Sequence, residues 1–402
     1  MKNDKKPQVR FKGFNDDWEQ RKLGEVFKEY SEKNHTELPA LTIIQGGGTV
    51  KREESDRSLM YDESNLSNYK MVRKDDFIVH LRSFEGGLEK SLLDGIISPA
   101  YHTFHSDVAD SRFYYPYFRS HEFIKHKLVP HVYGIRDGRS IDIAGMNTIE
   151  IPYTSIEEQR KIGDYLESLD HLITLHQRKC DKLQKIKKSM LEKMFPQNGM
   201  KKPEIRFKGF NDDWEQRKFE DVVQIERGGS PRPIDDYITD SPNGLNWVKI
   251  GDAPAQGHYI TKTAEKIRPE GLSKTREVHP GDLILSNSMS FGKPYIIGID
   301  GCIHDGWLFI RDTNNTFDLT FLCHLLGTPQ MLDQYRSLAA GSTVNNLNKE
   351  LVGNTVVTIP KIDEQRVLGQ YLERLDNLIT LHQRKLEKLK YIKKSMLENM
   401  FV

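Results

Sequence analysis

The most regular feature of the chain is the spacing of apolar residues in residues 156–195 and 362–401, where they recur at alternating steps of four and three. This spacing is a heptad pattern, which predicts one long amphipathic helix in each stretch. Both stretches lack proline, open with acidic residues and carry a Lys-Lys pair toward their end, so their charges complement the helix dipole. A helix of about 40 residues extends roughly 60 Å, which is longer than a small domain is wide. We therefore expect the two helices to pair along their apolar seams rather than to pack only on a domain core.

The seam positions of the two helices are expected to form the coiled-coil and subunit interface. These positions are Ile162, Leu166, Leu169, Ile173, His176, Leu183 and Met190 in the first helix, and Leu368, Leu372, Leu375, Ile379, His382, Leu386, Leu389 and Met396 in the second. His176 and His382 hold equivalent places in the two seams. We interpret them as polar residues that set the helix register rather than as metal ligands.

The chain is a tandem duplication with a period of about 206 residues. The segment RFKGFNDDWEQRK occurs at residues 10–22 and again, letter for letter, at residues 206–218, and the two helical stretches also match each other. Such a period indicates two domains rather than a solenoid, whose repeats are about 20 to 50 residues long. The first helix leads from the first variable region toward the second, and the second helix starts there, so the paired helices are expected to be antiparallel.

The variable regions between the repeats have the composition of mixed α/β domains. Residues 77–80, 148–152, 283–286 and 355–360 are rich in β-branched and apolar residues, which predicts strands, whereas residues 117–128 and 318–326 have helical spacing. The expected fold class is α/β (α+β): two mixed domains separated by two long antiparallel coiled-coil helices, with a pseudo-twofold internal repeat. The expected boundaries are a repeat segment at 1–22, a first variable domain at 23–152, a central helix at 153–198, a repeat segment at 199–218, a second variable domain at 219–360 and a distal helix at 361–402.

Charge and cysteine content narrow the class of protein. Lys and Arg (59) nearly balance Asp and Glu (58), so any binding to nucleic acid has to come from local patches. Cys180, Cys302 and Cys323 lie far apart and form no C-x-x-C pair, which argues against a disulfide framework and a thiolate zinc site. No run of about 18 apolar residues occurs, so we expect no membrane partner and a cytoplasmic location.

Motifs for catalysis are missing from the chain, so we expect no catalytic residue and no metal site. There is no Pro-Pro dipeptide, so the loop with which amino-methyltransferases hold a flipped base is absent. Gly292-Lys293 is followed by Pro294 instead of Ser or Thr, which excludes a Walker-type ATP site. Asp76 and Asp282 adjoin strand-like runs without a nearby E-x-K, and His102 and His105 lack a third ligand.

Polar loops in both halves have the composition of a DNA-binding surface. ERGGSPRP at 226–233 places two arginines around a Gly-Gly-Ser turn, and GIRDGRS at 134–140 matches GSTVNNLN at 341–348 in position but not in side chains. Arginine reads guanine and asparagine reads adenine, so differing side chains at matched positions suit two different half-sites. Any single one of these residues could instead belong to an ordinary solvated loop. The candidate DNA-binding residues are Arg82, Ser83, Arg136, Arg139, Ser140, Arg227, Gly229, Ser230, Arg232, Asn287, Ser288, Ser342, Thr343, Asn345 and Asn346.

In combination, the duplicated FKGFNDDWEQRK, the helix starts EEQRKIGDYL and DEQRVLGQYL, and the run from WVKIGDA through HPGDLILS to IHDGWLFI carry a resemblance that spans essentially the whole chain. The chain resembles the specificity subunit of a type I restriction-modification system. The resemblance implies a non-catalytic subunit that binds double-stranded DNA at a bipartite target and holds two methyltransferase (modification) subunits through its helices, with restriction/translocase subunits joining that core. S-adenosylmethionine, ATP and magnesium would be bound by those partners, and this chain would hold no cofactor.

Two other classes of function stay open on the residues alone. One is a stand-alone nuclease with an unrecognised site, and the other is a DNA-binding scaffold or repressor that uses its helices to pair with another protein. Incubation of the purified chain with magnesium and plasmid DNA separates the nuclease from the others, because only the nuclease predicts cutting.

Overall fold

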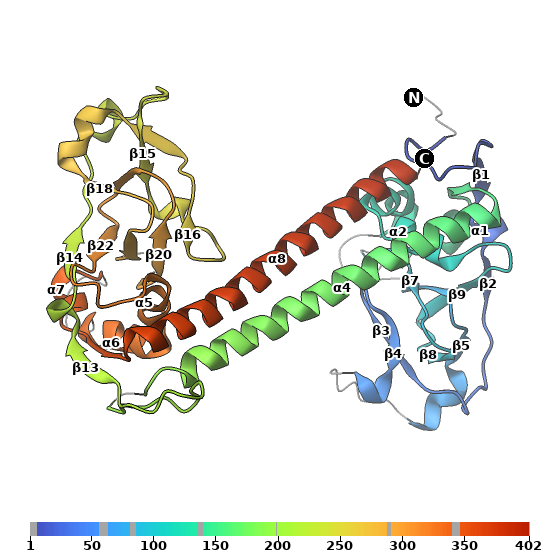
Figure 1. The fold of residues 1–402 in the computed structure, drawn as a ribbon. Helices are drawn as coiled ribbons and strands as arrows, with labels where there is room; N and C mark the ends of the chain where they lie inside the picture. The colour runs from blue at the N-terminus through green and yellow to red at the C-terminus, as the bar shows by residue number, and fades with distance from the viewer. Residues whose placement is uncertain are drawn as a thin grey trace. The chain divides into compact units, whose positions relative to one another are not determined.

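The computed structural model describes residues 6–55, 63–80, 86–134, 140–197, 199–287, 291–339 and 346–401. The chain divides into two compact units, the first made of Met1–Leu175 and Leu386–Val402 and the second of His176–Lys385. Each unit therefore contains part of both long helices, α4 (Ile156–Lys193) and α8 (Ile362–Met400), which are green and red in Figure 1. The prediction of two long helices is confirmed, and the first ends just before the Phe195-Pro196 step.

Within each unit, the segments of α4 and α8 pack against each other. In the second unit, His176 Nδ1 lies 2.8 Å from His382 Nδ1, and Lys187 Nζ lies 2.5 Å from Asp376 Oδ1. Partners further along α4 thus lie earlier on α8, so the helices run antiparallel, as predicted. In the first unit, Lys393 Nζ forms the corresponding contact with Asp170 Oδ1, at 2.5 Å.

The first unit contains a four-stranded antiparallel sheet in the order β2-β9-β6-β7, accompanied by the two-stranded pairs β1-β12, β3-β4, β5-β8 and β10-β11. Its strands are β1 (Glu19–Lys22), β2 (Lys28–Tyr30), β3 (Leu41–Ile44), β4 (Gly48–Lys51), β5 (Lys70–Val72), β6 (Phe77–His80), β7 (Glu89–Lys90), β8 (Gly95–Ile97), β9 (Tyr101–His105), β10 (Val132–Tyr133), β11 (Ser140–Ile141) and β12 (Glu150–Tyr153). Its short helices are α1 (Leu23–Val26), α2 (Ser111–Phe118) and α3 (Ile143–Met146).

The second unit contains a five-stranded sheet in the order β14-β22-β19-β20-β16, a four-stranded sheet in the order β17-β15-β21-β18, and the pair β13-β23. Its strands are β13 (Glu215–Lys218), β14 (Gln224–Arg227), β15 (Leu245–Val248), β16 (Tyr259–Ile260), β17 (Glu265–Ile267), β18 (Arg276–Val278), β19 (Leu283–Ser286), β20 (Pro294–Ile297), β21 (Gly301–Ile303), β22 (Trp307–Arg311) and β23 (Val356–Ile359). Its helices besides the long pair are α5 (Leu319–Leu326), α6 (Pro329–Ala339) and α7 (Lys349–Gly353). Both units are thus mixed α/β, as the composition predicted.

The seam residues of the long helices are part of the unit cores. Ile162, Leu166 and Leu169 are buried with the aromatic core of the first unit, and Leu368 and Leu372 with that of the second. The heptad stripe therefore serves two purposes, since it pairs the helices and also seats each helix on its own domain.

A repeated frame closes both units in the same way. Strand β1 pairs antiparallel with β12 in the first unit, and β13 pairs with β23 in the second. Arg10 forms a forked ion pair with the buried Glu158, and Arg206 forms the same pair with Glu364, with nitrogen–oxygen distances of 2.6 to 2.8 Å. The repeated segments RFKGF and EEQR/DEQR each supply one side chain of this ion pair, so the structure explains why this arginine and this glutamate recur.

The predicted strands are present, with β6 and β19 matching residues 77–80 and 283–286. The predicted helix at 318–326 is α5, whose N-cap Asp318 accepts a hydrogen bond from Phe321 N. The helical spacing at 117–128 is instead divided, because α2 ends at Phe118 and a π-helical turn covers Phe123–Leu128. Among the described residues, no helix has both the length and the apolar content needed to cross a membrane.

Candidate nucleic-acid interface

Eight of the residues predicted to bind DNA lie outside the described residues: Arg82, Ser83, Arg136, Arg139, Ser288, Ser342, Thr343 and Asn345. The other seven are described, and six of these belong to the second unit. The candidate DNA-binding residues whose surroundings are described therefore lie almost entirely in the second unit.

The loop after β14 folds around Asp305, which lies between β21 and β22. Arg227 Nε donates to the Asp305 carbonyl at 3.2 Å, and Asp305 N donates to Ser230 Oγ at 3.4 Å. The Arg232 guanidinium lies 3.7 Å from the Asp305 carboxylate. One short segment therefore brings together three of the side chains that the sequence singled out.

Close packing of the backbone requires glycine at two positions of this loop, Gly228 and Gly229. A Cβ on Gly228 would meet His304 O at 2.2 Å, and a Cβ on Gly229 would meet Lys274 O at 2.4 Å. The backbone of the loop thus packs directly on two neighbouring segments, and a larger residue would push it away. Gly229 was predicted to contact DNA. Its close packing on Lys274 gives a second reason for glycine at this position.

Asn287 differs from what the sequence led us to expect of a base-reading residue. Its side chain is only 4% exposed, and its Nδ2 donates to the Asp305 carbonyl at 2.8 Å. Its own carbonyl accepts from Leu347 N at 3.0 Å. Asn287 therefore joins three loops from the inside, because a buried amide must satisfy its hydrogen bonds within the protein.

Asn346 and Ser140 flank the matched loops in the two units. Asn346 is exposed and directly precedes Leu347, so the Asn287–Leu347 hydrogen bond fixes the backbone beside it. Ser140 lies in β11, opposite Tyr133 of β10. In the second unit the structure thus brings Asn346 to the same group of loops as the segment 227–232, whereas Ser140 is the only candidate of the first unit within the described residues.

The charges near Asp305 are mostly positive. Arg232 has a side chain that is 81% exposed, and Arg227 is also exposed. Burial lowers the pKa of His304 below its ordinary value, and Lys249, Arg232 and Arg227 act in the same direction against the opposing charge of Asp305. The two exposed arginines give a surface patch that can attract phosphate, although the whole chain has almost no net charge.

Asp305 is the central residue that the sequence reasoning missed. It lies in the HDGW segment at 304–307, next to the buried Trp307, and an acidic residue is an unusual choice at a surface expected to bind DNA. An acidic residue among predicted DNA-binding residues was the feature of the sequence that could have identified Asp305, because such an acid can hold arginine side chains in place.

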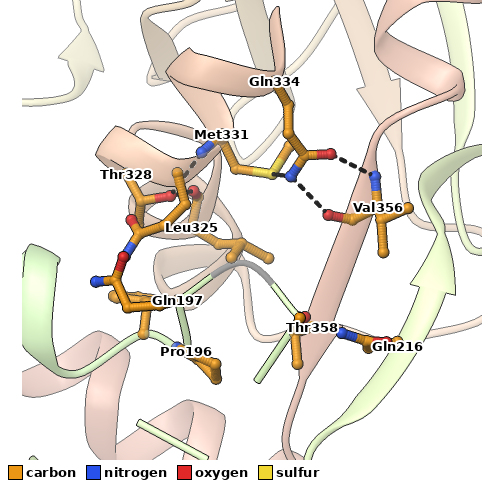
Figure 2. A pocket seen from close by; sticks show the side chains of 12 residues that line it. Pro196, Gln197, Gln216, Leu325, Thr328, Met331, Gln334, Val356 and Thr358 are labelled. Atoms are coloured by element: carbon orange, nitrogen blue, oxygen red, sulfur yellow. Dashed lines mark hydrogen bonds between the residues drawn. The ribbon is translucent and has the colours of Figure 1, made fainter. Parts of the chain in front are cut away.

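A cavity of about 340 Å³ in the second unit lies between the segment after α4, helix α6 and strand β23 (Figure 2). Gln334 donates to Val356 O at 3.0 Å and accepts from Val356 N at 2.8 Å, as a neighbouring strand would. None of the described residues that line the cavity is an acid, a base, a cysteine or a histidine. It therefore offers neither a general base nor a metal ligand.

The long helices also expose apolar side chains away from their seam. Leu172 and Leu175 on α4 are 40% and 38% exposed, and Leu378 and Leu381 on α8 are 44% and 46% exposed. The second pair follows the first by the repeat period, so each unit carries one copy of the same apolar pair. These four leucines lie outside the seam, so the heptad pattern did not single them out.

Comparison with known proteins identifies the repeated architecture. The family model described as Type I restriction modification DNA specificity domain matches residues 15–185 and again residues 211–391. The type I restriction enzyme MjaVIII specificity subunit of Methanocaldococcus jannaschii is 26% identical over 64% of this chain and 62% of its own length. The putative type I restriction enzyme MjaX specificity subunit of the same organism is 24% identical over 64% of this chain and 60% of its length. The chain thus spans less than two thirds of the length of these relatives.

The fold has a counterpart of the same extent among solved structures. The crystal structure of the type-I restriction-modification system S subunit from M. genitalium covers 99% of both chains with a TM-score of 0.59, at 16% sequence identity. At this identity the likeness concerns the fold alone.

Proposed function

Because the chain belongs to the family of type I restriction modification DNA specificity domains, we propose that it is the sequence-reading subunit of a type I restriction-modification complex. In this proposal, residues 23–152 and 219–360 are two recognition domains, and each reads one half of a split DNA target. The chain contributes recognition and assembly, while methyl transfer and cleavage take place on partner subunits.

One observation carries the proposal: the two units share their frame and differ in their sheets and loops. The frame comprises the ion pairs Arg10–Glu158 and Arg206–Glu364 and the closing strand pairs. The sheets differ, since the first unit has a four-stranded sheet where the second has sheets of five and four strands. Duplication of a frame around different surfaces is the arrangement that two unlike half-sites require.

Within the second domain, the proposed DNA surface is the group of loops joined by Asp305 and Asn287. Its exposed members are Arg227, Arg232 and Asn346. Guanidinium groups suit phosphates and guanine edges, and an asparagine amide suits adenine. We assign Asn287 to the support of these loops, because its amide is used inside the protein.

The helices are the proposed docking surface for two copies of one modification subunit. The support is the repetition of the exposed pairs Leu172/Leu175 and Leu378/Leu381 at the repeat period. Repeated exposed apolar residues on otherwise polar helices are typical of protein–protein contact. Restriction subunits would then join this core.

Mapping N6-methyladenine in the genome tests the proposal. Cells with the gene are expected to methylate one bipartite motif that cells without it leave unmodified. Replacement of residues 23–152 by the corresponding domain of another family member is expected to change one half of the motif and keep the other. A methylome that is the same with and without the gene contradicts the proposed function, and a change in both halves contradicts the division into two reading domains.

A further inference from the structure

Two histidines and an aspartate from three separate elements meet in the second unit. His258 precedes β16, His324 belongs to α5, and Asp376 belongs to α8. Their ligand atoms all lie within 4.8 Å of one another. The group borders a cavity of about 260 Å³ that is also lined by Tyr259 and Glu373, so an ion from solvent has a route to it.

The carboxylate of Asp376 has one oxygen in use and one without a hydrogen bond. Oδ1 contacts Lys187 Nζ of α4 at 2.5 Å. Oδ2 is buried and receives no hydrogen bond from the described residues, although His258 Nε2 lies 3.3 Å away and His324 Nε2 lies 3.7 Å away. A buried carboxylate oxygen that faces two imidazole nitrogens but has no hydrogen bond of good geometry is a rare feature, and it points to a missing ligand or a function.

The imidazole of His258 is placed as metal ligands usually are. His258 Nδ1 lies 3.3 Å from the Pro294 carbonyl, to which it can donate, and this orientation directs Nε2 toward Asp376. Such an outer hydrogen bond fixes the tautomer of a metal-binding histidine. His324 is only 4% exposed, and the described residues form no hydrogen bond with its ring.

The repeat supplies an internal comparison. Asp170 and Lys393 of the first unit form the same ion pair as Asp376 and Lys187. The N-caps Asp110 and Asp318 correspond, because the backbone N–H of each donates to the glutamine of a repeated helix start. Counting from these caps, Pro116 stands in the first unit where His324 stands in the second. The first unit therefore has the ion pair between the helices without a histidine at the position of His324.

We propose that His258, His324 and Asp376 form a zinc-binding site in the second unit. Two imidazole nitrogens and one carboxylate oxygen are a ligand set that zinc accepts, with a fourth position left for water, whereas calcium and magnesium prefer oxygen ligands alone. Bonds of about 2.0 to 2.2 Å in a tetrahedral site place ligand atoms roughly 3.3 to 3.6 Å apart, close to the two distances at Asp376 Oδ2.

In the zinc-bound protein, Lys187 stays on Oδ1 as the outer partner of the carboxylate, while its contact with His258 Nε2, 3.3 Å in this structure, gives way to the metal. The ion would tie the loop before β16 and helix α5 to helix α8. The proposal does not depend on the proposed DNA function, because it concerns only this chain and a metal ion.

Zinc titration of the purified full chain tests the proposal, using protein without a histidine tag that has been treated with a chelator. Calorimetry is expected to show one zinc site per chain, lost in the near-isosteric variant His324→Gln and in His258→Gln. The affinity is expected to fall by roughly 100-fold or more, since even changes outside the ligand shell cost about 10- to 100-fold. Two matched controls, Asp170→Asn at the repeat equivalent and His176→Gln at the other close histidine pair, are expected to bind zinc as the unchanged chain does.

Cobalt binding gives a second measurement that separates lost ligands from lost folding. The unchanged chain is expected to give the visible absorption of four-coordinate cobalt, and His324→Gln is expected to lose it while keeping its circular dichroism and melting temperature. The absence of zinc binding by the unchanged chain would overturn the proposal. Equal zinc affinity in the double variant His258→Gln/His324→Gln would overturn it as well.

Discussion

His176 Nδ1 lies 2.8 Å from His382 Nδ1, so two residues that are equivalent in the repeat meet directly on the second unit's helix pair. A hydrogen bond between these two nitrogens requires one of them to accept, so the two imidazole rings cannot both be positively charged. Burial lowers the pKa of both histidines, and Lys179 and Lys385 act in the same direction. The interpretation that these residues set the helix register stays a prediction, and the contact gives it a concrete geometry.

The histidine pair predicts a loss of helix pairing in mild acid. Because the pKa of each ring is lower in the folded chain than the unfolded value of about 6.5, the unfolded chain binds more protons below that pH. The stabilisation is therefore complete above about pH 6.5 and declines as the pH falls through the depressed pKa values. Urea unfolding between pH 5 and 8 measures this, and the variant His176→Leu/His382→Leu should flatten that part of the profile. An unchanged slope in this variant would assign the pH dependence to other groups.

Truncation of a seam leucine is expected to destabilise the first unit. Leu169 is buried in the core of that unit, so Leu169→Ala removes packed methyl groups and leaves a cavity that costs about 2 to 5 kcal/mol. The control Leu172→Ala changes an exposed leucine of the same helix and is expected to cost less than about 0.5 kcal/mol. Thermal and urea unfolding of the isolated chain measure both, and equal effects would mean that the seam assignment is wrong.

Removal of the repeated arginine is expected to be costly because its partner is buried. Arg206→Met leaves the Glu364 carboxylate uncompensated inside the second unit, which typically costs about 3 to 5 kcal/mol. The exposed pair Lys361–Asp212 lies in the same region, and Asp212→Asn is expected to change the stability far less, because solvent screens an exposed ion pair. Partial recovery of stability in Arg206→Met/Glu364→Gln would show that the buried charge causes the loss, and no recovery would argue against that cause.

Features with a local cause could be predicted from the sequence. The heptad spacing predicted α4 and α8, and the β-branched runs at 77–80 and 283–286 predicted β6 and β19, because such periodicities are set by near neighbours. Features that depend on distant contacts could not. The sequence predicted Asn287 to be a surface residue, but it is buried and forms hydrogen bonds with Asp305 and Leu347.

The histidine cluster is a second feature that depends on distant contacts and could not be predicted from the sequence. His258, His324 and Asp376 lie on separate elements and form no spaced motif, so the sequence predicted no metal site. Only the tertiary packing of α5 and α8 on the sheet brings their side chains together. The candidate DNA-binding residues that lie outside the described ranges, Arg136 and Asn345 among them, stay predictions from the sequence.

The exposed leucines predict where the modification subunits bind. Leu175→Ser and Leu381→Ser remove apolar area from two equivalent places without touching the buried seam. Each single variant is expected to lower the amount of modification subunit that co-purifies with the chain, and the double variant is expected to abolish stable assembly. Tyr391→Ser, at a highly exposed aromatic residue without this repeat relationship, serves as the control. Full assembly of the double variant would exclude these leucines from the docking surface.

Alanine substitutions at Asn346 and Asn287 are expected to act in different ways, the first on DNA binding and the second on stability. Asn346 is exposed beside the loops that Asp305 holds together, so Asn346→Ala is expected to cost about 1 to 3 kcal/mol of binding to the specific site and little on random DNA. Asn287→Ala removes a buried donor to the Asp305 carbonyl, so it is expected to lower the melting temperature of the chain and to weaken binding by disturbing the loops around Arg227. Titration of the assembled complex with target and scrambled duplexes, alongside thermal unfolding, separates the two effects. If Asn346→Ala weakened binding to both duplexes equally, its side chain would contact phosphate, and the reading of a base would have to come from another residue of the loop.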